Sequence, residues 1–288
     1  MDQAKVLKEL AEGVISGEEE KNTRFVTVTS GKGGVGKTNF ALNLSIALSK
    51  FGKKVLLADA DIGLANVNIL LGTSHPLTIY DIITKGIDWR EVVYPFNDNF
   101  FILPGCSGIE EVLNLTEVQL QTLVRILDGM SKMFDFIIID TGAGINHSLI
   151  AFALASPELI LITTPEPSAL ADAYATLKVL TQKGYDGKIW TVVNMVRDSA
   201  EGDKAYIALS TLVRRFFGKE IEHLVNIPDD PDVHAAVSLQ KPILNYKPSS
   251  KFSTSVITAA RKLLGVYTPE KQRFSFWDKL IKTLSRRW

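Results

Sequence analysis

Hydrophobic residues follow two alternating patterns along the chain. One is a short run of consecutive apolar residues, typical of a β-strand, and the other repeats apolar residues every three or four positions, typical of an α-helix. The predicted strands are 24–30, 53–60, 99–105, 134–140, 158–164, 188–194 and 221–227. The clearest predicted helices are 36–52, 116–132, 168–184 and 203–217. Strands therefore alternate with helices over most of the chain.

The strand runs indicate how the sheet is covered. The segments "FIIID" (136–140) and "LILIT" (159–163) are apolar on both faces, as expected for strands that are buried on both sides. Strands that alternate with helices form a mostly parallel sheet, because each helix crosses back over the sheet before the next strand begins. We therefore expect an α/β fold with a doubly wound, mostly parallel sheet and helices on both faces.

Two terminal segments lie outside this alternation. Residues 1–16 have a helical pattern, and its apolar side is formed by Val6, Leu7, Leu10, Val14 and Ile15. The charged stretch 17–22 predicts a linker, and the pattern breaks again at "YTPEKQR" (267–273). We therefore divide the chain into an N-terminal helix with its linker (1–21), a main domain (22–267) and a C-terminal segment (268–288).

Composition narrows the function classes. The 288 residues include 32 basic and 32 acidic side chains, so the formal net charge is zero and no overall field attracts nucleic acid. Cys106 is the single cysteine, which excludes a disulfide framework and an all-cysteine metal site, and fits a reducing cytosol. The four histidines have no metal-ligand spacing. With neither a long apolar run nor the apolar core of a signal peptide, the chain is expected to be cytoplasmic.

A phosphate-binding motif lies between the first predicted strand and the first predicted helix. Residues 31–38, Gly-Lys-Gly-Gly-Val-Gly-Lys-Thr, fit the pattern G-x-x-x-x-G-K-[ST] in the context that this motif requires. Its backbone N–H groups surround phosphate oxygens, while Lys37 reaches the β- and γ-phosphates and the Thr38 hydroxyl ligates Mg²⁺. The cofactors expected are therefore ATP or ADP and Mg²⁺. The expected contacts are Gly33, Gly34, Val35, Gly36, Lys37, Thr38 and Asn39.

Lys32 is a second lysine in this loop, and the mechanism above does not require it. The stretch "KGGVGKT" (32–38) resembles the deviant phosphate loop of the MinD/ParA ATPases. In that family the extra lysine crosses the interface of an ATP-bound homodimer and contacts the nucleotide of the other subunit. The resemblance covers roughly residues 22–265. It implies a MinD-like P-loop ATPase in which Lys37 serves its own ATP and Lys32 acts in trans, as an arginine finger does.

Acidic residues at strand ends extend the predicted site. Asp59 and Asp61 are two residues apart at the end of the predicted strand 53–60, and side chains two apart on a strand share a face. By the same resemblance, Asp61 positions the attacking water and Asp59 supports Mg²⁺ or its waters. Asp140, which ends "FIIID", matches the aspartate that lies near Mg²⁺ in the family. Asn66 matches an asparagine of the dimer interface.

Later residues match positions that bind the nucleotide or the other subunit. The segment "TTPEPSALADAYA" (163–175) resembles the family segment that contacts the ribose or the extra lysine across the dimer, through Glu166, Ser168 and Asp172. Asn194, Pro228 and Asp229 match positions that contact adenine. We expect slow hydrolysis of ATP to ADP and phosphate, because a molecular switch must persist between events.

The C-terminal segment predicts a membrane-binding helix. Two tryptophans beside basic residues are typical of a helix that lies in the interface of an anionic membrane. The helix is expected to hold the ATP-bound dimer at the inner face of the cell membrane, and the alternative is a helix docked on the protein's own surface. The expected membrane contacts are Phe274, Phe276, Trp277, Leu280, Ile281, Leu284 and Trp288.

The N-terminal segment indicates one branch of the family. Asp2, Gln3 and Ala4, with Leu7 and Lys8, resemble the D-Q-A-x-x-L-R motif of the flagellar-number regulators of the FlhG type, also called FleN or YlxH. In that branch the segment stimulates a GTPase of the FlhF type. Lys8 departs from the usual arginine and lacks its planar fork. Flagellar basal-body proteins of the switch or C-ring are a further partner class that the resemblance implies.

Three other functions remain as alternatives. A MinD proper would place the division site, and the D-Q-A segment argues against it. A ParA-type DNA-partition ATPase would need a basic surface patch, and the zero net charge disfavours it, so no nucleic-acid partner is expected. An iron–sulfur carrier on the same ATPase core would need paired cysteines, which this chain does not have.

Overall fold

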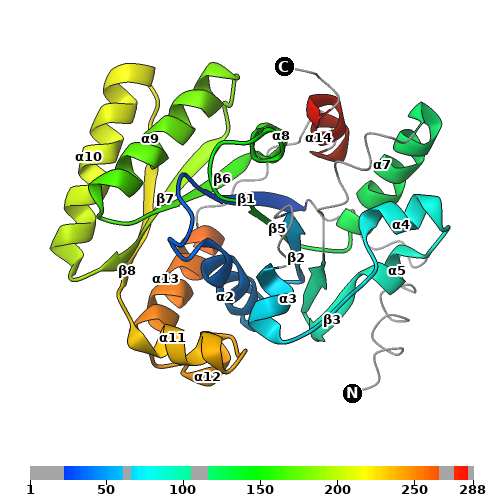
Figure 1. Cartoon of the computed structure of the whole chain (residues 1–288), viewed down its shortest axis with the longest axis horizontal. Coiled ribbons are helices and arrows are strands. Elements are labelled where there is room, and N and C mark those ends of the chain that lie inside the picture. Colours follow the sequence, from blue (N-terminus) through cyan, green and yellow to red (C-terminus); the bar gives the residue numbers. More distant parts are fainter. Residues whose placement is uncertain (1–22, 61–65, 105–115, 266–275, 285–288) are drawn as a thin grey trace.

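The fold is built around one sheet of eight strands. A computed structural model describes residues 23–60, 66–104, 116–265 and 276–284. Figure 1 shows the sheet passing through the middle of the molecule with helices packed on both sides. In chain order the strands are β1 (Arg24–Ser30), β2 (Val55–Ala60), β3 (Tyr94–Asn97), β4 (Phe100–Leu103), β5 (Phe136–Thr141), β6 (Glu158–Thr163), β7 (Lys188–Val196) and β8 (Glu222–Pro228).

The sheet has the order β3-β4-β2-β5-β1-β6-β7-β8. All neighbouring strands run parallel except β3, which is antiparallel to β4 at one edge. The expected doubly wound, mostly parallel sheet is therefore confirmed. Because β2, β5 and β1 are parallel neighbours, their carboxyl ends lie together at one edge of the sheet. The strand order reverses beside β1, and folds of this kind bind ligands at such a position.

Helices cover both faces of the sheet. The helices of nine or more residues in the main domain are α2 (Lys37–Lys50), α7 (Glu117–Ser131), α8 (His147–Ala155), α9 (Pro167–Gln182), α10 (Ser199–Phe217) and α13 (Lys251–Gly265). The shorter ones are α3 (Asn66–Leu71), α4 (Ile79–Thr84), α5 (Trp89–Val92), α11 (Pro231–Ser238) and α12 (Ile243–Tyr246), and the C-terminal segment contributes α14 (Phe276–Leu284). The expected helices 36–52, 116–132, 168–184 and 203–217 correspond to α2, α7, α9 and α10.

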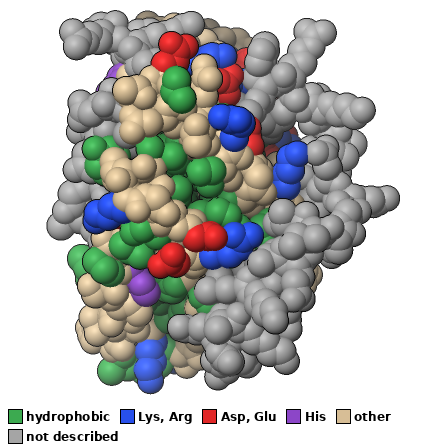
Figure 2. Space-filling view, turned by 90° about the vertical axis from the view of Figure 1, so that its right-hand side faces the viewer, with side chains coloured by type: hydrophobic (Ala, Val, Ile, Leu, Met, Phe, Trp, Pro, Cys, Tyr) green, Lys and Arg blue, Asp and Glu red, His purple; other side chains and the backbone are tan. Residues whose placement is uncertain are grey.

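Alternate side chains of the buried strands pack into two hydrophobic cores, one on each face of the sheet. On β2, Val55 and Leu57 pack into the core beneath α2 and α13, whereas Leu56 and Ala58 pack into the core beneath α7, α8 and α14. This is the period-two alternation of a strand covered on both faces. On the side of the molecule that carries α4, α5 and α7, hydrophobic side chains are interspersed with charged ones (Figure 2).

The C-terminal helix α14 lies against the protein's own core. Phe276, Trp277, Leu280 and Leu284 are buried among residues of β1, α7 and α8, and Ile281 is half-buried. The Phe276 ring stacks on Phe25 of β1 at 4.3 Å between ring centres. The structure thus shows the docked alternative, in which burying each such side chain contributes roughly 1.5–3 kcal/mol. Phe274 and Trp288 lie outside the described residues.

Candidate nucleotide site

The phosphate loop connects β1 to α2 and is shaped by two glycines. Gly36 has a φ of 87°, a left-handed conformation that glycine adopts without strain, and it precedes the first residue of α2. A Cβ atom on Gly31 would lie 2.3 Å from the backbone carbon of Asp172 in α9. Gly31 is therefore needed because the loop passes directly against the backbone of α9.

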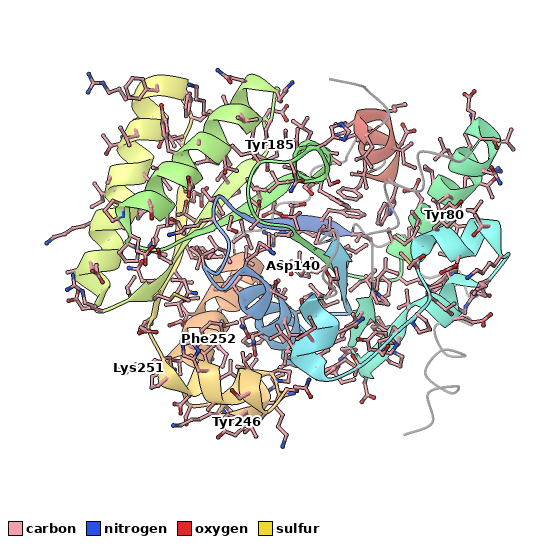
Figure 3. All side chains as sticks on the ribbon, in the orientation of Figure 1. Tyr80, Asp140, Tyr185, Tyr246, Lys251 and Phe252 are labelled. Atoms are coloured by element: carbon pink, nitrogen blue, oxygen red, sulfur yellow. The ribbon has the colours of Figure 1, made fainter. Side chains whose placement is uncertain are left out.

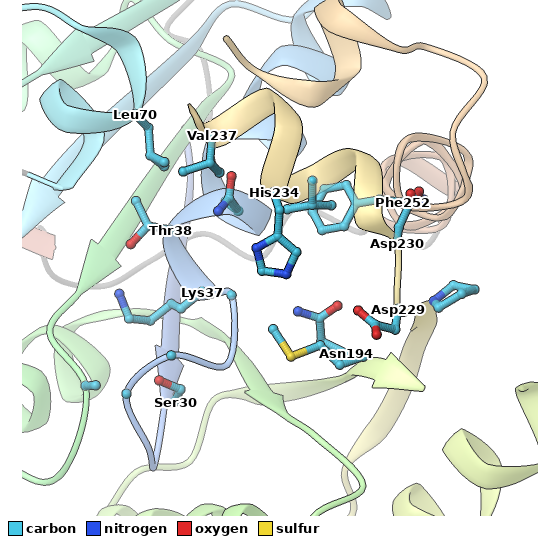
Figure 4. Close-up of a pocket in the computed structure, with 18 of the residues that line it drawn as sticks. Ser30, Lys37, Thr38, Leu70, Asn194, Asp229, Asp230, His234, Val237 and Phe252 are labelled. Carbon is cyan, nitrogen blue, oxygen red and sulfur yellow. Dashed lines mark hydrogen bonds between the residues drawn. The ribbon is translucent and has the colours of Figure 1, made fainter. Parts of the chain in front are cut away.

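The loop forms one wall of a pocket of about 440 Å³. Such a volume is in the range that small-molecule ligands occupy. In Figure 4, Lys37 and Thr38 lie on one side of the pocket and Asn194 and Asp229 on the other. The expected nucleotide contacts that line it are Gly33, Gly34, Gly36, Lys37, Thr38, Asn39, Asn194, Pro228 and Asp229. The structure therefore brings the two halves of the predicted nucleotide site together.

Two carboxylates lie beside each other at the phosphate end. Asp59 on β2 and Asp140 on β5 are paired in register, and both are buried. Lys37 Nζ lies 2.8 Å from Asp140 Oδ1, and this ion pair is also buried. Asp140 lies near the centre of the molecule (Figure 3). The buried Lys37 at the start of α2 is thus held by the carboxylate of Asp140 near the end of β5, the neighbour of β1.

The residues at this end fit a magnesium ion. Mg²⁺ prefers oxygen ligands and is commonly held by one or two carboxylates together with substrate phosphates. Asp59 and Asp140 supply carboxylates at neighbouring strand ends, and Thr38 supplies a hydroxyl in the first turn of α2. In the described part of the chain, no group of three or more His, Cys, Asp and Glu side chains could hold a metal by itself.

Lys32 projects to a different place from Lys37. Its Nζ atom donates hydrogen bonds to Glu166 Oε2 at 2.9 Å and to Ser168 Oγ at 3.0 Å, both at the N-terminal end of α9. These three side chains are exposed. The predicted link between Lys32, Glu166 and Ser168 thus exists within one chain. Asp172 is exposed one turn further along α9, and its backbone abuts Gly31.

The far end of the pocket is tied to the phosphate loop. Asn194 is buried and donates its side-chain N–H to the carbonyl oxygen of Val35 at 2.8 Å. This hydrogen bond joins the end of β7 to the phosphate loop. Met195, the next residue, has a φ of 59°, which is strained for a non-glycine residue and coincides with an irregularity in the β7–β8 pairing.

Sequence reasoning missed Asp230 and His234, which also line this pocket. The Asp230 side chain accepts the N–H of Asp232 at the start of α11 and the N–H of Phe252 in α13. Burial alone would raise the pKa of Asp230, but these backbone hydrogen bonds hold it below its usual value. The Asp-Pro pair at 230–231 is a recognisable helix start. Nothing comparable marks His234.

Several predicted residues lie outside the described part of the chain. They include Asp61, the side chain of Asn66, and the N-terminal residues Asp2, Gln3, Ala4, Leu7 and Lys8. Their predicted roles stay predictions. A second cavity of about 510 Å³, lined by α4, α5 and α7, contains none of the predicted site residues. In the described residues, no helix is long and apolar enough to cross a membrane.

Comparison with known proteins gives consistent matches over most of the chain. A family profile described as an AAA domain matches residues 23–183. Antiactivator FleN of Pseudomonas aeruginosa is 34% identical over 240 residues, which is 83% of this chain and 86% of FleN. The flagellum site-determining protein YlxH of Helicobacter pylori is 33% identical over 272 residues, 91% of each chain.

Solved structures show the same fold. The cell division ATPase MinD of Pyrococcus furiosus has a TM-score of 0.68 and 30% identity, covering 85% of this chain and 99% of that one. The septum site-determining protein MinD of Pyrococcus horikoshii, complexed with Mg-ADP, has a TM-score of 0.67 and 30% identity, covering 84% and 96%. The Pyrococcus horikoshii protein, which shares this fold, therefore binds Mg-ADP, the kind of ligand that the pocket fits.

Proposed function

The chain belongs to the MinD/ParA-type family of P-loop ATPases, and from this premise we propose that it is an ATP-switched regulator of flagellum number or placement. The observation that carries the proposal is the D-Q-A-x-x-L sequence at residues 2–7 ahead of this ATPase domain. The names of two relatives, antiactivator FleN and flagellum site-determining protein YlxH, support it.

The switch is hydrolysis of ATP in a homodimer. Lys37 would exchange its ion pair with Asp140 for the β- and γ-phosphates of ATP, and Asp140, Asp59 and Thr38 would hold Mg²⁺ or its waters. Asp61 orients the attacking water, because phosphoryl transfer requires the attacking group to be held in position. Bound Mg²⁺ would supply positive charge beside the phosphates, and ATP would supply the phosphoryl group. Hydrolysis is slow, so that each dimer persists.

Dimer formation requires Lys32 to change partners. In the single chain, Lys32 is bound to Glu166 and Ser168. These contacts are solvent-exposed, and exposed ion pairs contribute little, about 0–1 kcal/mol. Lys32 can therefore exchange them for the phosphates bound by the other subunit at small cost. Glu166 is then released to contact the ribose across the interface.

Membrane binding uses α14 and requires this helix to undock from the protein core. The residues expected to enter lipid include Trp277 and Leu280, which are buried in the protein here. An anionic membrane offers the same apolar surroundings and adds attraction to Lys279 and Lys282, which are exposed. Two such helices on one ATP-bound dimer bind together through effective concentration. The dimer is thus cytoplasmic until it joins the inner face of the membrane.

The partner of the N-terminal segment is a GTPase of the FlhF type. Leu7 and Leu10 supply apolar contacts, and Gln3 supplies a polar group for the GTP site, as water-orienting glutamines do in related GTPases. Flagellar basal-body proteins of the switch or C-ring are further proposed partners. The linker 17–22 lets the segment reach another protein while the ATPase domain stays in place.

The test is GTP turnover by an FlhF-type GTPase mixed with a peptide of residues 1–20. We expect the peptide to stimulate turnover and its Gln3→Ala version to lose most of the effect. A peptide with Lys8→Arg restores the arginine of the motif and is the positive control. If that control stimulates and the natural peptide does not, Lys8 has inactivated the motif and the GTPase role is wrong.

Placement of the division site is a second candidate, because both MinD structures named above are division proteins. Cells that lack the gene distinguish the two functions. A change in the number or position of flagella with normal septa supports the flagellar role. Misplaced septa with normal flagella support the division role instead.

A further inference from the structure

The two ends of the chain carry the same apolar spacing. The buried residues of α14 occupy positions i, i+1, i+4 and i+8, namely Phe276, Trp277, Leu280 and Leu284. The apolar side predicted for the N-terminal segment has identical offsets, with Val6, Leu7, Leu10 and Val14. Residues at these offsets lie along one side of a helix. A surface that accepts one stripe therefore has the right spacing for the other.

The surface that α14 covers, the α14 groove, is mostly apolar and also makes a polar contact with the helix. Its floor includes Phe25 of β1, and its walls include Leu127 and Met130 of α7 and Phe152 of α8, all of which are buried. Trp277 Nε1 donates a hydrogen bond to Ser131 Oγ at 2.8 Å. The groove is thus a continuation of the hydrophobic core rather than a shallow surface patch.

Release of α14 would expose the apolar residues of the groove to water. When the helix enters a membrane, its own stripe passes from one apolar environment to another. The walls of the groove, however, pass from an apolar environment to water, and no lipid covers them. Exposed apolar surface of this kind is unfavourable in proportion to its area. A second occupant of the groove would remove that penalty.

The N-terminal segment is tethered at the edge of this groove. Thr23 Oγ1 donates a hydrogen bond to the carbonyl oxygen of Ser131, the same residue that Trp277 contacts. The linker 17–22 has six residues, which span up to about 20 Å when extended. The stripe of α14 rises only about 12 Å over its eight residue steps. The segment therefore reaches the whole groove in either direction.

We propose that residues 1–16 take the seat of α14 when α14 leaves it, so that the two terminal helices occupy one groove in turn. The inference rests on the proposed membrane and GTPase functions. While α14 is docked, Leu7 and Leu10 are available to the GTPase. Once α14 enters a membrane, the same leucines are buried in the groove and stimulation stops.

The order of preference follows from side-chain size. Phe276 and Trp277 are matched by Val6 and Leu7, which bury less apolar area in the same places. Trp277 also makes the hydrogen bond to Ser131, for which Leu7 has no donor. The groove therefore holds α14 in the absence of lipid and accepts the N-terminal segment only after α14 has gone.

Thiol cross-linking of the full chain tests this exchange. Cys106 is first replaced by serine, and cysteines are introduced at Ala11, beside the N-terminal stripe, and at Ala151 in the groove cluster. With ATP and anionic vesicles, we expect the Ala11→Cys/Ala151→Cys variant to cross-link within one chain at least fivefold faster than without vesicles. Adding Leu10→Lys breaks the stripe and should abolish the increase. An Ala11→Cys/Thr211→Cys pair, with Thr211 exposed on α10, is the distance control.

Two further arms separate the outcomes. Sedimentation of the same samples reports membrane binding, so protein that sediments without cross-linking overturns the exchange while the membrane role stands. Cross-links between two chains would show that a second copy covers the groove, and this also overturns it. If the protein does not sediment, the membrane role fails. Trp277→Glu then tests the exchange alone, because it expels α14 without lipid and should raise the Ala11–Ala151 cross-link by itself.

Discussion

The phosphate loop and the α14 groove are held together in different ways. The loop is fixed by its backbone, since Gly31 lies against the backbone of α9 and the Val35 carbonyl accepts a hydrogen bond from Asn194. The helix α14 is fixed by apolar side chains, with the Trp277–Ser131 hydrogen bond as a polar contact. Backbone contacts can be satisfied in one geometry, whereas apolar contacts can be satisfied by any surface of suitable shape.

This difference separates a preformed ligand site from an exchangeable one. The phosphate loop of the nucleotide pocket is held by its own backbone contacts, and a loop ordered in this way lowers the cost of binding a ligand. The groove instead holds a helix through buried apolar side chains, and we propose that this helix can leave it. Substitutions in the first region should therefore affect ligand binding, and substitutions in the second should affect which segment is docked.

The largest effect on ligand binding is expected from Lys37→Ala. The variant loses the charge-assisted contact to the phosphates and the buried ion pair with Asp140. We expect ATP affinity to fall by about 100-fold or more, equivalent to roughly 2.7 kcal/mol. Calorimetric titration with ATP measures it. Lys178→Ala, at an exposed position on α9, is the matched control and should bind ATP normally. Unchanged affinity in Lys37→Ala would remove the loop from the binding site.

The largest effect on helix docking is expected from Trp277→Glu. Removing a large aromatic side chain from a core costs about 3–5 kcal/mol, and burying a carboxylate in its place adds to that cost. We expect α14 to undock while the ATPase domain stays folded and binds ATP. Hydrogen exchange of the 276–284 amides should become fast. Lys279→Glu, on the exposed side of the same helix, should exchange as the natural chain does. Slow exchange in Trp277→Glu would contradict docking by the stripe.

A smaller effect is expected from Gly31→Ala, which places a methyl group against the backbone of α9. Overpacking of this kind typically costs about 1–3 kcal/mol. The melting temperature should fall and ATP affinity should weaken as the loop shifts. Gly33→Ala is a close control, because its Cβ would meet only the Ala143 side chain at 4.0 Å. Equal melting temperatures for the two variants would refute the close approach.

The smallest effect is expected from Ser131→Ala. It removes the acceptor of the Trp277 N–H but leaves the apolar stripe in place. A lost hydrogen bond of this kind costs about 0.5–1.5 kcal/mol. Exchange of the α14 amides should therefore rise by roughly tenfold at most, since 1.4 kcal/mol is a factor of ten. A larger rise would mean that the hydrogen bond, and not apolar burial, holds the helix.

Local patterns were enough to predict the loop and the sheet. The motif at 31–38 and the buried runs ending at Asp59 and Asp140 determine their own structure, and parallel pairing then places both carboxylates together. The short edge strand β3 was missed because "YPFN" contains a proline and lacks an apolar run.

Other features depend on contacts between residues far apart in the sequence. The pocket wall at Asp230 and His234 depends on how β8 and α11 approach α2. The seat of α14 is set by Phe25, more than 250 positions away from its stripe. An amphipathic pattern shows that one side of a helix is buried, but it does not show whether protein or lipid buries it.

The central claim is that the protein works as an ATP-bound dimer with Lys32 acting in trans, and a mixture of two inactive variants tests it most directly. Lys32→Ala keeps Asp61 but supplies no lysine, and Asp61→Ala supplies the lysine but does not orient water. Each alone should hydrolyse ATP very slowly. In an equal mixture, half of the dimers combine the two chains, and each contains one complete site, so about a quarter of the natural activity should return. A mixture as inactive as its components would contradict the account.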